Sequence, residues 1–261
     1  MISLRSTEEI EAIARAGAIV GGFFEAVRGK VVPGASTLEL DLFCEEYIVS
    51  HEGAVPAFKG LYGFPGSACI SINEEVVHGI PGHHRILKDG DIVSVDVGVW
   101  MAGWYTDSAR TYPVGEVSRD AKALLEVTRK ALDAAVSVAV RGNHVGDIGA
   151  AVVDSLDGRP YGIIRDLVGH GIGRELHEEP QVPNVGRPGH GPLLREGMVL
   201  AIEPMISAGT ASIRTLDDGW TVVTADGSLS AHFEHTVAIT AEGPRVLTGD
   251  RDAAGNAVGG A

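Results

Sequence analysis

The stretch DIVSVDVGVWMAGWYTDSAR, residues 91–110, decides the fold. Its β-branched run, its glycine-containing turn and the strand-forming residues after that turn predict a β-hairpin. Each arm carries one aspartate, Asp96 and Asp107. A turn centred between Met101 and Ala102 places the two aspartates directly opposite each other, with Cβ atoms roughly 4.5–5.5 Å apart on one face. Two bare carboxylates repel at that separation unless cations lie between them, so the hairpin predicts a metal pair.

The composition is that of a globular chain with an acidic surface. With 261 residues and 44% hydrophobic content, the chain can bury a full core, and its length allows one or two domains. The 21 basic and 35 acidic residues give a net charge of −14 without a basic cluster, which argues against nucleic-acid binding. Cys44 and Cys69 are too few for a disulfide framework and fit reduced thiols. The start lacks an apolar secretory region and no apolar run reaches membrane-spanning length, so we expect a cytoplasmic protein without membrane contact.

Two capping boxes predict the first two helices. Ser6 with Glu9 opens a helix from about Thr7 to Arg28, and Ser36 with Glu39 opens a second one. Further on, Ser118 starts a helix to about Val140, residues 146–156 form a shorter one, and residues 161–240 return to strands and turns. The order of helix, helix and strands therefore occurs twice.

The sequence itself repeats with the same order. LKDGDIVSVD at 87–96 aligns without gaps with LREGMVLAIE at 194–203, which matches Asp96 with Glu203. The inter-helix loops VVPGASTLEL and AVRGNHVGDI align at nearly the same offset, and HGIP from His78 matches HEEP from His177 less closely. We therefore expect an α+β fold with two pseudo-symmetric halves and an antiparallel sheet covered by helices. The halves are about 1–115 and 116–248 of a single domain 1–248, and residues 249–261, rich in Gly and Ala, are expected to be a disordered tail.

The repeat predicts four carboxylates on inner strands. Asp96 and Glu203 each end a buried strand and face each other across the pseudo-twofold axis, while Pro204 holds Glu203 extended. On the returning strand SAHFEHTVAIT, Glu234 is placed as Asp107 is in the first half. Desolvating four carboxylates is too costly without compensating charge.

A histidine is the remaining candidate ligand. In VGHGIGRELHEEPQVPN, His170 lies between glycines that let the backbone approach a site, and His177 follows seven residues later. Four carboxylates and one neutral imidazole, without a thiolate, suit a pair of hard or borderline divalent ions rather than structural zinc. Taken alone, each residue also has an ordinary interpretation: a strand-edge aspartate, a core histidine in a tight turn, a solvated glutamate. The repeat favours the joint interpretation, because it puts the acids on equivalent inner strands.

Five segments of the chain resemble those of one enzyme family. INEEVVHGIP, SVDVGVW with TDSAR, GHGIGRELHEEPQVPN, AIEPM and HFEHTVAIT are similar to type I methionine aminopeptidases, which have the pita-bread fold, and the similarity runs from about Ser3 to Leu247. The resemblance implies a metalloaminopeptidase that removes the initiator methionine from nascent proteins and peptides with a small second residue. It implies two divalent cations per chain, Co²⁺, Mn²⁺, Fe²⁺ or Zn²⁺. Asp107 and Glu234 would bridge the ions, Asp96 would chelate one, and His170 and Glu203 would complete the other.

The residue types also suggest a mechanism. Two ions roughly 3.5–4 Å apart can hold a bridging water as hydroxide near neutral pH. The substrate amine near Asp96 would place the first peptide carbonyl against that hydroxide. His177 would donate a hydrogen bond to the developing oxyanion, and Glu203 would carry the proton to the leaving amine. His78 and His177 match the histidines that contact substrate in this family. The alternative for both histidines is a structural hydrogen bond.

The resemblance also implies an apolar pocket for the first side chain of the substrate. Its walls would be Cys69, Trp220, Phe64, Leu61, Phe58 and Leu176, and a thioether suits such walls because sulfur contacts aromatic edges favourably. The chain departs from the usual family pattern at Phe58, where cysteine is common, and at Leu61 and Phe64, where tyrosines are usual. Ordinary core packing is the alternative for each of these side chains.

Further expectations rest on the resemblance alone. The first is a monovalent cation, Na⁺ or K⁺, held by backbone near Asn73, Glu75 and Ser230. The others are that the enzyme is of the short bacterial form, is a monomer and associates with the ribosome.

Two other functions stay open. One is an Xaa-Pro-type peptidase on the same fold, which usually carries a large N-terminal domain. The other is a non-catalytic binding protein on the same fold, which should have lost at least one ligand.

Overall fold

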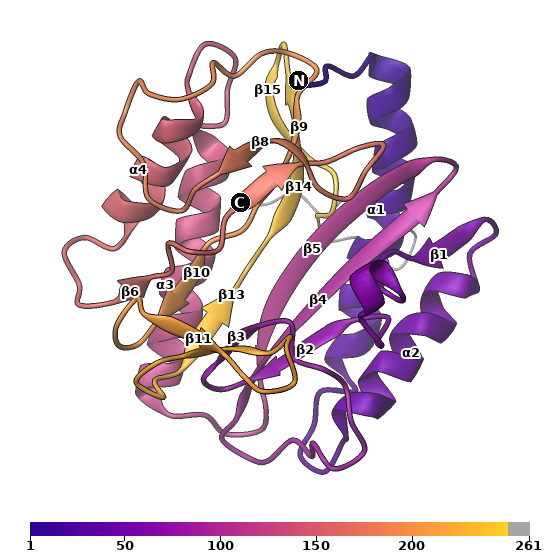
Figure 1. Cartoon of the computed structure of the whole chain (residues 1–261), viewed down its shortest axis with the longest axis vertical. Helices are drawn as coiled ribbons and strands as arrows, with labels where there is room; N and C mark the ends of the chain where they lie inside the picture. The colour runs from indigo at the N-terminus through magenta and orange to yellow at the C-terminus, as the bar shows by residue number, and fades with distance from the viewer. Residues whose placement is uncertain (250–261) are drawn as a thin grey trace.

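Two pairs of helices enclose the strands from opposite sides (Figure 1). The computed structural model describes residues 1–249, so the predicted tail lies, except for Gly249, outside the described residues. The helices are α1 (Thr7–Arg28), α2 (Thr37–Val49), the short 3₁₀ helix η1 (Leu61–Gly63), α3 (Arg119–Ser137) and α4 (Val145–Ser155). The strands are β1 (Ala54–Pro56), β2 (Cys69–Ile72), β3 (Glu75–Val77), β4 (Ile92–Met101), β5 (Trp104–Pro113), β6 (Gly162–Ile163), β7 (Gly169–Gly171), β8 (Glu178–Val182), β9 (Val199–Ile202), β10 (Met205–Ser207), β11 (Ile213–Thr215), β12 (Val222–Thr224), β13 (Ser230–His232), β14 (His235–Thr240) and β15 (Gly243–Val246). Within residues 1–249, no helix combines the length and apolar character that a membrane span needs.

The capping boxes predicted for α1 and α2 are confirmed. In α1 the Glu9 backbone N–H donates to the Ser6 hydroxyl and the Ser6 N–H donates to the Glu9 carboxylate, and the pair at α2 bonds in the same way. Helix α3 ends at Ser137 rather than at about Val140. The carbonyl of Val138 accepts hydrogen bonds from the Asn143 side chain and the Val140 N–H, both at 2.8 Å, whereas the Gly142 N–H that would continue the helix donates to the Leu194 carbonyl.

Each helix pair covers one group of strands. Strands β1, β2 and β5 join β4 in one sheet, where α1 and α2 bury Phe23, Phe24 and Ile48 against the valines of β4. Strands β15, β14, β9, β7 and β8 form a second sheet in that order. Helix α3 packs against β9 of this sheet and against β10, helix α4 packs against β8 and α3, and Leu124 and Ile148 belong to the core that these elements share. Two three-stranded sheets, β13-β10-β6 and β11-β12-β3, complete the fold, so within residues 1–249 the antiparallel strands form four sheets rather than one shared sheet.

The β4–β5 hairpin exists, but its predicted register is wrong. Gly98 pairs with Asp107 and Asp96 pairs with Ala109, so the two aspartates are not directly opposed. The turn is formed by Ala102 and Gly103, both with positive φ (52° and 86°), as a type I′ hairpin requires. Because the pairing shifts by two positions, both carboxylates stay on one face as diagonal neighbours.

The corresponding hairpin of the second half is interrupted at its centre. His235 pairs with Ile202 on one side of the break, and His232 pairs with Met205 in the same register on the other side. Pro204 has no N–H to donate at this point, and the ladder stops there. Glu234 therefore lies just before β14 rather than within a continuous strand as predicted.

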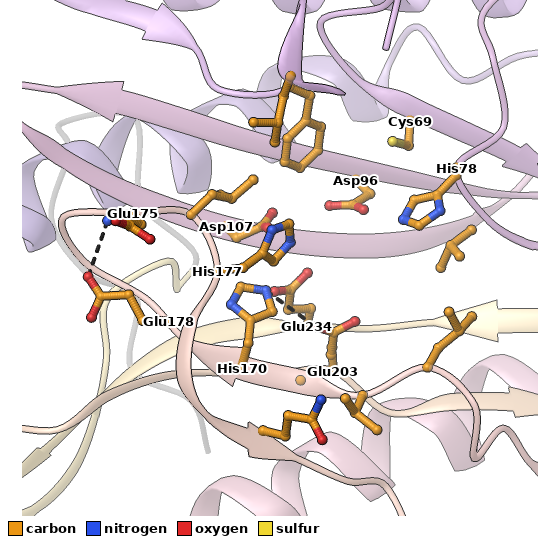
Figure 2. A pocket seen from close by; sticks show the side chains of 18 of the residues that line it. Cys69, His78, Asp96, Asp107, His170, Glu175, His177, Glu178, Glu203 and Glu234 are labelled. Carbon is orange, nitrogen blue, oxygen red and sulfur yellow. Dashed lines mark hydrogen bonds and ion pairs between the residues drawn. The ribbon is translucent and has the colours of Figure 1, made fainter. Parts of the chain in front are cut away.

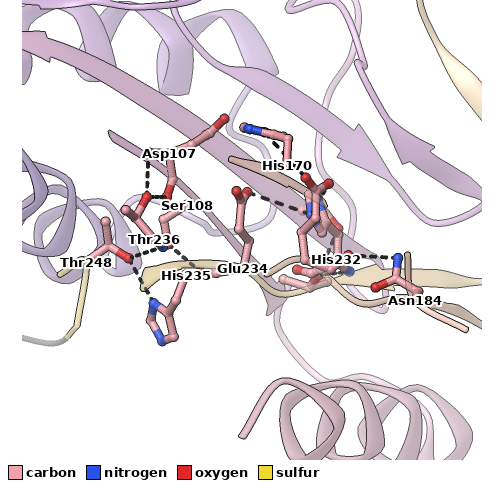
Figure 3. A network of polar contacts seen from close by, with 12 residues as sticks. Asp107, Ser108, His170, Asn184, His232, Glu234, His235, Thr236 and Thr248 are labelled. Atoms are coloured by element: carbon pink, nitrogen blue, oxygen red, sulfur yellow. Dashed lines mark hydrogen bonds and ion pairs between the residues drawn. The ribbon is translucent and has the colours of Figure 1, made fainter. Parts of the chain in front are cut away.

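The two halves meet along a seam between β5 and the β13–β14 segment (Figure 3). The Thr236 hydroxyl accepts a hydrogen bond from the Asp107 N–H at 3.0 Å and donates one to the Asp107 carbonyl at 2.7 Å. The Ser108 hydroxyl donates to the Glu234 carbonyl at 2.6 Å, and the Glu234 N–H donates to the Ala109 carbonyl at 2.9 Å. Side-chain hydroxyls thus complete the pairing where the backbone ladder stops, and they fix Asp107 beside Glu234.

The seam predicts the effect of Thr236→Val. This nearly isosteric change leaves the buried N–H and C=O of Asp107 without partners, so we expect the free energy of unfolding to fall by about 2–4 kcal/mol. Urea denaturation measures the loss. Thr215→Val, on the exposed face of β11, is the matched control and should change stability little. Equal stability of the two variants would contradict the role of the seam.

Candidate metal centre

One cavity of about 910 Å³ opens between the two halves. All the predicted ligand and pocket residues line it: Phe58, Leu61, Phe64, Cys69, His78, Asp96, Asp107, His170, Leu176, His177, Glu203, Trp220 and Glu234. In Figure 2 the carboxylates and the histidines converge on a common space from both groups of strands. The fold therefore brings together residues that are far apart in the sequence.

Three of the predicted ligands are close enough together to bind one metal ion. Asp107, His170 and Glu234 each offer one ligand atom, and these atoms lie within 4.8 Å of one another. The three side chains are buried, at 5%, 8% and 2% exposure. Glu203 approaches the same group, with its Oε1 3.6 Å from His170 Nε2. Asp96 enters from β4 on the same face as Asp107.

The ring of His170 is oriented to bind a metal through Nε2. Its Nδ1 lies 2.9 Å from the Gly171 carbonyl, which only accepts hydrogen bonds, so Nδ1 carries the proton and donates it. Burial, with His177 nearby, lowers the pKa of His170 to about 4. At neutral pH the ring is therefore neutral with a free lone pair on Nε2, which is the form that coordinates metals.

The carboxylates lack the partners that buried acids normally have. Asp96 Oδ1, Asp107 Oδ1 and Glu234 Oε1 are buried without a hydrogen-bond partner. Burial raises the pKa of Asp107 to about 7. Burial and then the charge of Asp107 raise the pKa values of Asp96, Glu203 and Glu234 well above their usual range. Bare oxygen donors beside a neutral imidazole fit hard or borderline divalent cations, which would supply the missing counter-charge.

An apolar pocket begins directly beside the carboxylates. Cys69 pairs with Asp96 across β2 and β4, so their side chains leave the sheet on the same face. Phe58 packs closely against Gly98, where a Cβ would come within 2.7 Å of its ring. Phe64 meets Trp220 edge to face, with ring centroids 5.1 Å apart. The sequence departures at Phe58, Leu61 and Phe64 therefore all lie in this pocket.

His78 and His177 flank the carboxylates. The His177 ring lies edge to face with that of His170, 4.5 Å between centroids, and His78 lies 6.4 Å from Trp220. His78 has a φ of 60°, a left-handed conformation that is strained for a residue other than glycine and often marks a functional position. Burial lowers the pKa of both histidines, so both are neutral at neutral pH.

His232 also lines the cavity, and the sequence did not identify it as a site residue. Its Nε2 lies 3.7 Å from Glu203 Oε2 and 3.9 Å from Glu234 Oε2, and neither ring nitrogen has a hydrogen-bond partner. Burial lowers its pKa to about 3, so the ring is neutral. The sequence did contain a signal for His232 as a site residue. Side chains two positions apart on a strand point to the same face, and His232 is two positions before the predicted ligand Glu234.

The comparisons with known proteins agree with this site. Residues 11–241 match the family described as Metallopeptidase family M24. The chain belongs to this family. It is 51% identical over 248 residues to a methionine aminopeptidase from Clostridium perfringens, covering 95% of this chain and 99% of that one. It superposes on the crystal structure of a methionine aminopeptidase from Thermotoga maritima with a TM-score of 0.93 and 45% identity, covering 95% and 99% of the two chains.

A second group of M24-like structures shares the fold at lower identity. The prolidase from Pyrococcus furiosus superposes with a TM-score of 0.76 at 24% identity, and the match covers 95% of this chain but 66% of that one. The predicted pita-bread fold is therefore confirmed. The M24 chain is an enzyme of the metallopeptidase class, and its buried carboxylates and His170 are a centre suited to divalent metal.

The residues named for a monovalent cation lie together, and the side chains of Asn73 and Glu75 have protein partners. The Ser230 N–H donates to the Asn73 carbonyl at 2.8 Å, and the Asn73 side-chain amide donates to Asp91 at 2.8 Å. The Glu75 carboxylate pairs with Arg85. Na⁺ or K⁺ binding near these residues stays a prediction.

The raised pKa values predict proton release when this M24 centre takes up metal. Acids whose pKa is raised hold protons near neutral pH, and a divalent cation binds only the carboxylate form, so loading must displace them. At about pH 6.5 we expect about one proton or more per chain to be released. Calorimetric titration of metal-stripped protein with Mn²⁺, in buffers of different ionisation enthalpy, measures the number. Asp120→Asn, on the exposed first turn of α3, should not change it. Heats that do not depend on the buffer would contradict the raised pKa values.

Proposed function

We propose that this M24 enzyme is a methionine aminopeptidase that removes the initiator methionine when the second residue is small. One observation carries the proposal: the metal-suited carboxylates lie directly beside an apolar pocket. The pairing of Cys69 with Asp96 puts the first wall of that pocket next to a carboxylate of the centre. The side chain of the substrate's N-terminal residue can then enter the apolar pocket while its peptide bond lies at the carboxylates. An aminopeptidase needs this arrangement.

Two divalent cations per chain, Mn²⁺, Co²⁺, Fe²⁺ or Zn²⁺, fit the donor set. The resemblance implies that Asp107 and Glu234 would be shared by both ions, and the seam supports this by keeping their backbones side by side. Asp96 would be a ligand of one ion. His170 and Glu203, whose Nε2 and Oε1 atoms are 3.6 Å apart, would be ligands of the other. When bound, the ions would supply an activated water and a Lewis acid for the peptide carbonyl.

The chain's own residues then orient the substrate and move the protons. Asp96 anchors the free N-terminal amine at the entrance of the pocket. His177, whose pKa is lowered by partial desolvation, donates a hydrogen bond to the oxygen that becomes negative in the transition state. Glu203 carries a proton to the leaving amine, and the Asn184 side chain holds its backbone carbonyl at 3.1 Å. His78 contacts the substrate from the opposite side of the cavity.

The pocket suits a methionine side chain. Phe58, Phe64, Cys69 and Leu176 are buried, and the edge of an aromatic ring is a favourable partner for a thioether sulfur. With Phe58 in place of the usual cysteine, and Leu61 and Phe64 in place of tyrosines, these walls have fewer polar groups. A branched side chain such as leucine fits a narrow pocket less well than the unbranched methionine.

The wider setting of the enzyme is part of the proposal. We propose that residues 1–248 act as a single catalytic domain, because the ligands come from both halves and the cavity lies between them. A cytoplasmic monomer that acts on nascent chains at the ribosome follows from the role of the family.

The proposal predicts a metal-dependent and narrow activity. Metal-stripped protein supplied with Mn²⁺ or Co²⁺ should release methionine from Met-Ala-Ser, and should act much more slowly on Leu-Ala-Ser and Met-Leu-Ser. Asp107→Asn should lower kcat by about 10²-fold or more, because a shared ligand is lost, whereas Asp120→Asn should not. Chromatography of the released amino acid measures the rates. Absence of methionine release with every divalent metal tried would overturn the proposal, and cleavage of Xaa-Pro dipeptides instead would favour a prolidase.

A further inference from the structure

Three segments far apart in the chain meet beside the cavity. They are residues 3–5 before α1, the turn of the β4–β5 hairpin, and the loop 173–178 that carries Leu176 and His177. The Arg5 N–H donates to the Gly197 carbonyl at 2.7 Å, and the Tyr105 N–H donates to the Gly173 carbonyl at 2.8 Å. These backbone bonds bring the side chain of Arg5 against the base of the loop.

The guanidinium of Arg5 is buried between the hairpin and the loop. Its side chain is only 9% exposed, and its Cζ lies 5.2 Å from the centroid of the Trp104 ring. A Cβ on Gly173 would clash with the guanidinium, so glycine is needed there for this close approach. Arg5 donates a hydrogen bond to Glu178 Oε2 and forms an ion pair with it.

Glu178 in turn closes the loop. Its other oxygen, Oε1, accepts the backbone N–H of Arg174 at 2.7 Å and that of Glu175 at 3.1 Å, and the second of these bonds is drawn in Figure 2. Leu176 and His177 lie between the donors and the acceptor in the sequence. The conformation of the loop therefore depends on where the Glu178 carboxylate lies, and Arg5 fixes one of its oxygens.

A second cation supports the same loop from outside. Arg174 Cζ lies 3.7 Å from the centroid of the Trp104 ring, and Arg174 pairs with Glu9 at 3.6 Å. Arg174 is exposed, whereas Arg5 is buried and contacts Glu178 directly. Without Arg5, the carboxylate of Glu178 would be half-buried near the other acids of the cavity with no counter-charge.

We propose that Arg5 is a positioning residue for the reaction: through Glu178 it holds the loop 174–178 so that His177 faces the metal centre. The proposal rests on the role proposed above for His177. A displacement of about 1 Å in a positioned group can lower a rate by up to about 10²-fold, which sets the scale of the expected effect.

The test compares Arg5→Met with Arg5→Lys, each in the wild-type chain and combined with His177→Ala. We expect Arg5→Met to lower kcat for Met-Ala-Ser about tenfold, with KM and Mn²⁺ stoichiometry nearly unchanged. Arg5→Lys keeps a donor for Glu178 and should recover most of the rate. In the His177→Ala background, Arg5→Met should cause almost no further loss, because both changes then act on the same interaction.

Arg245→Met is the matched control, since Arg245 forms an ion pair with Glu11 on the surface away from the cavity. It should leave kcat unchanged. If Arg5→Met does not fold, Glu178→Gln removes the same ion pair and should give the same loss that depends on His177.

The outcomes separate this inference from the proposed function. A wild-type enzyme that releases no methionine contradicts the function itself. An active wild-type enzyme with an equally active Arg5→Met variant overturns only the role of Arg5. A tenfold loss that persists unchanged in the His177→Ala background also overturns it, because Arg5 would then act on something other than His177.

Discussion

The repulsion among Asp96, Asp107, Glu203 and Glu234 is the interaction that the rest of the structure must balance. The four carboxyls share one cavity. Burial raises the pKa values of all four, and the charge of Asp107 raises those of Asp96, Glu203 and Glu234 further. A chain that holds them there needs both a rigid frame and a source of positive charge. The seam provides the frame, because the Thr236 and Ser108 hydroxyls tie the backbones of Asp107 and Glu234 together across the two halves. Divalent cations provide the charge, which accords with membership of a metallopeptidase family.

The two-fold organisation of the chain explains how one site receives ligands from both ends of the sequence. Each half supplies a helix pair, a hairpin and two acids, and the cavity lies where the hairpins meet. The symmetry is broken where function differs. The first hairpin is continuous and borders the apolar pocket, because Cys69 pairs with its Asp96 and Phe58 packs against its Gly98. The second is interrupted at Pro204, where Glu203 and His232 enter the cavity.

Short-range sequence patterns and the internal repeat predicted the helix starts and the grouping of the four acids at one cavity correctly, whereas the strand register and a distant side-chain contact were not predicted. The capping boxes at Ser6 and Ser36 located α1 and α2, because a cap involves residues only three apart. The repeat correctly placed Asp96, Asp107, Glu203 and Glu234 at one cavity, since a strand's alternation survives a shift of two residues. The predicted register of the hairpin was wrong because the true register depends on a positive φ at Ala102. Alanine rarely adopts a positive φ, so the sequence does not indicate it. The contact between Arg5 and Glu178 could not be predicted, because it joins residues 173 positions apart through the packing of Trp104.

The central claim is that the seam holds two carboxylates so that they share two ions. A crystal structure of the Mn²⁺-loaded protein, with anomalous differences recorded at the manganese edge, tests it most directly. The account predicts two anomalous peaks about 3.5–4 Å apart, both in contact with Asp107 and Glu234, with His170 at one peak and Asp96 at the other. Peaks that do not share Asp107 and Glu234, or manganese bound outside this cavity, would contradict it.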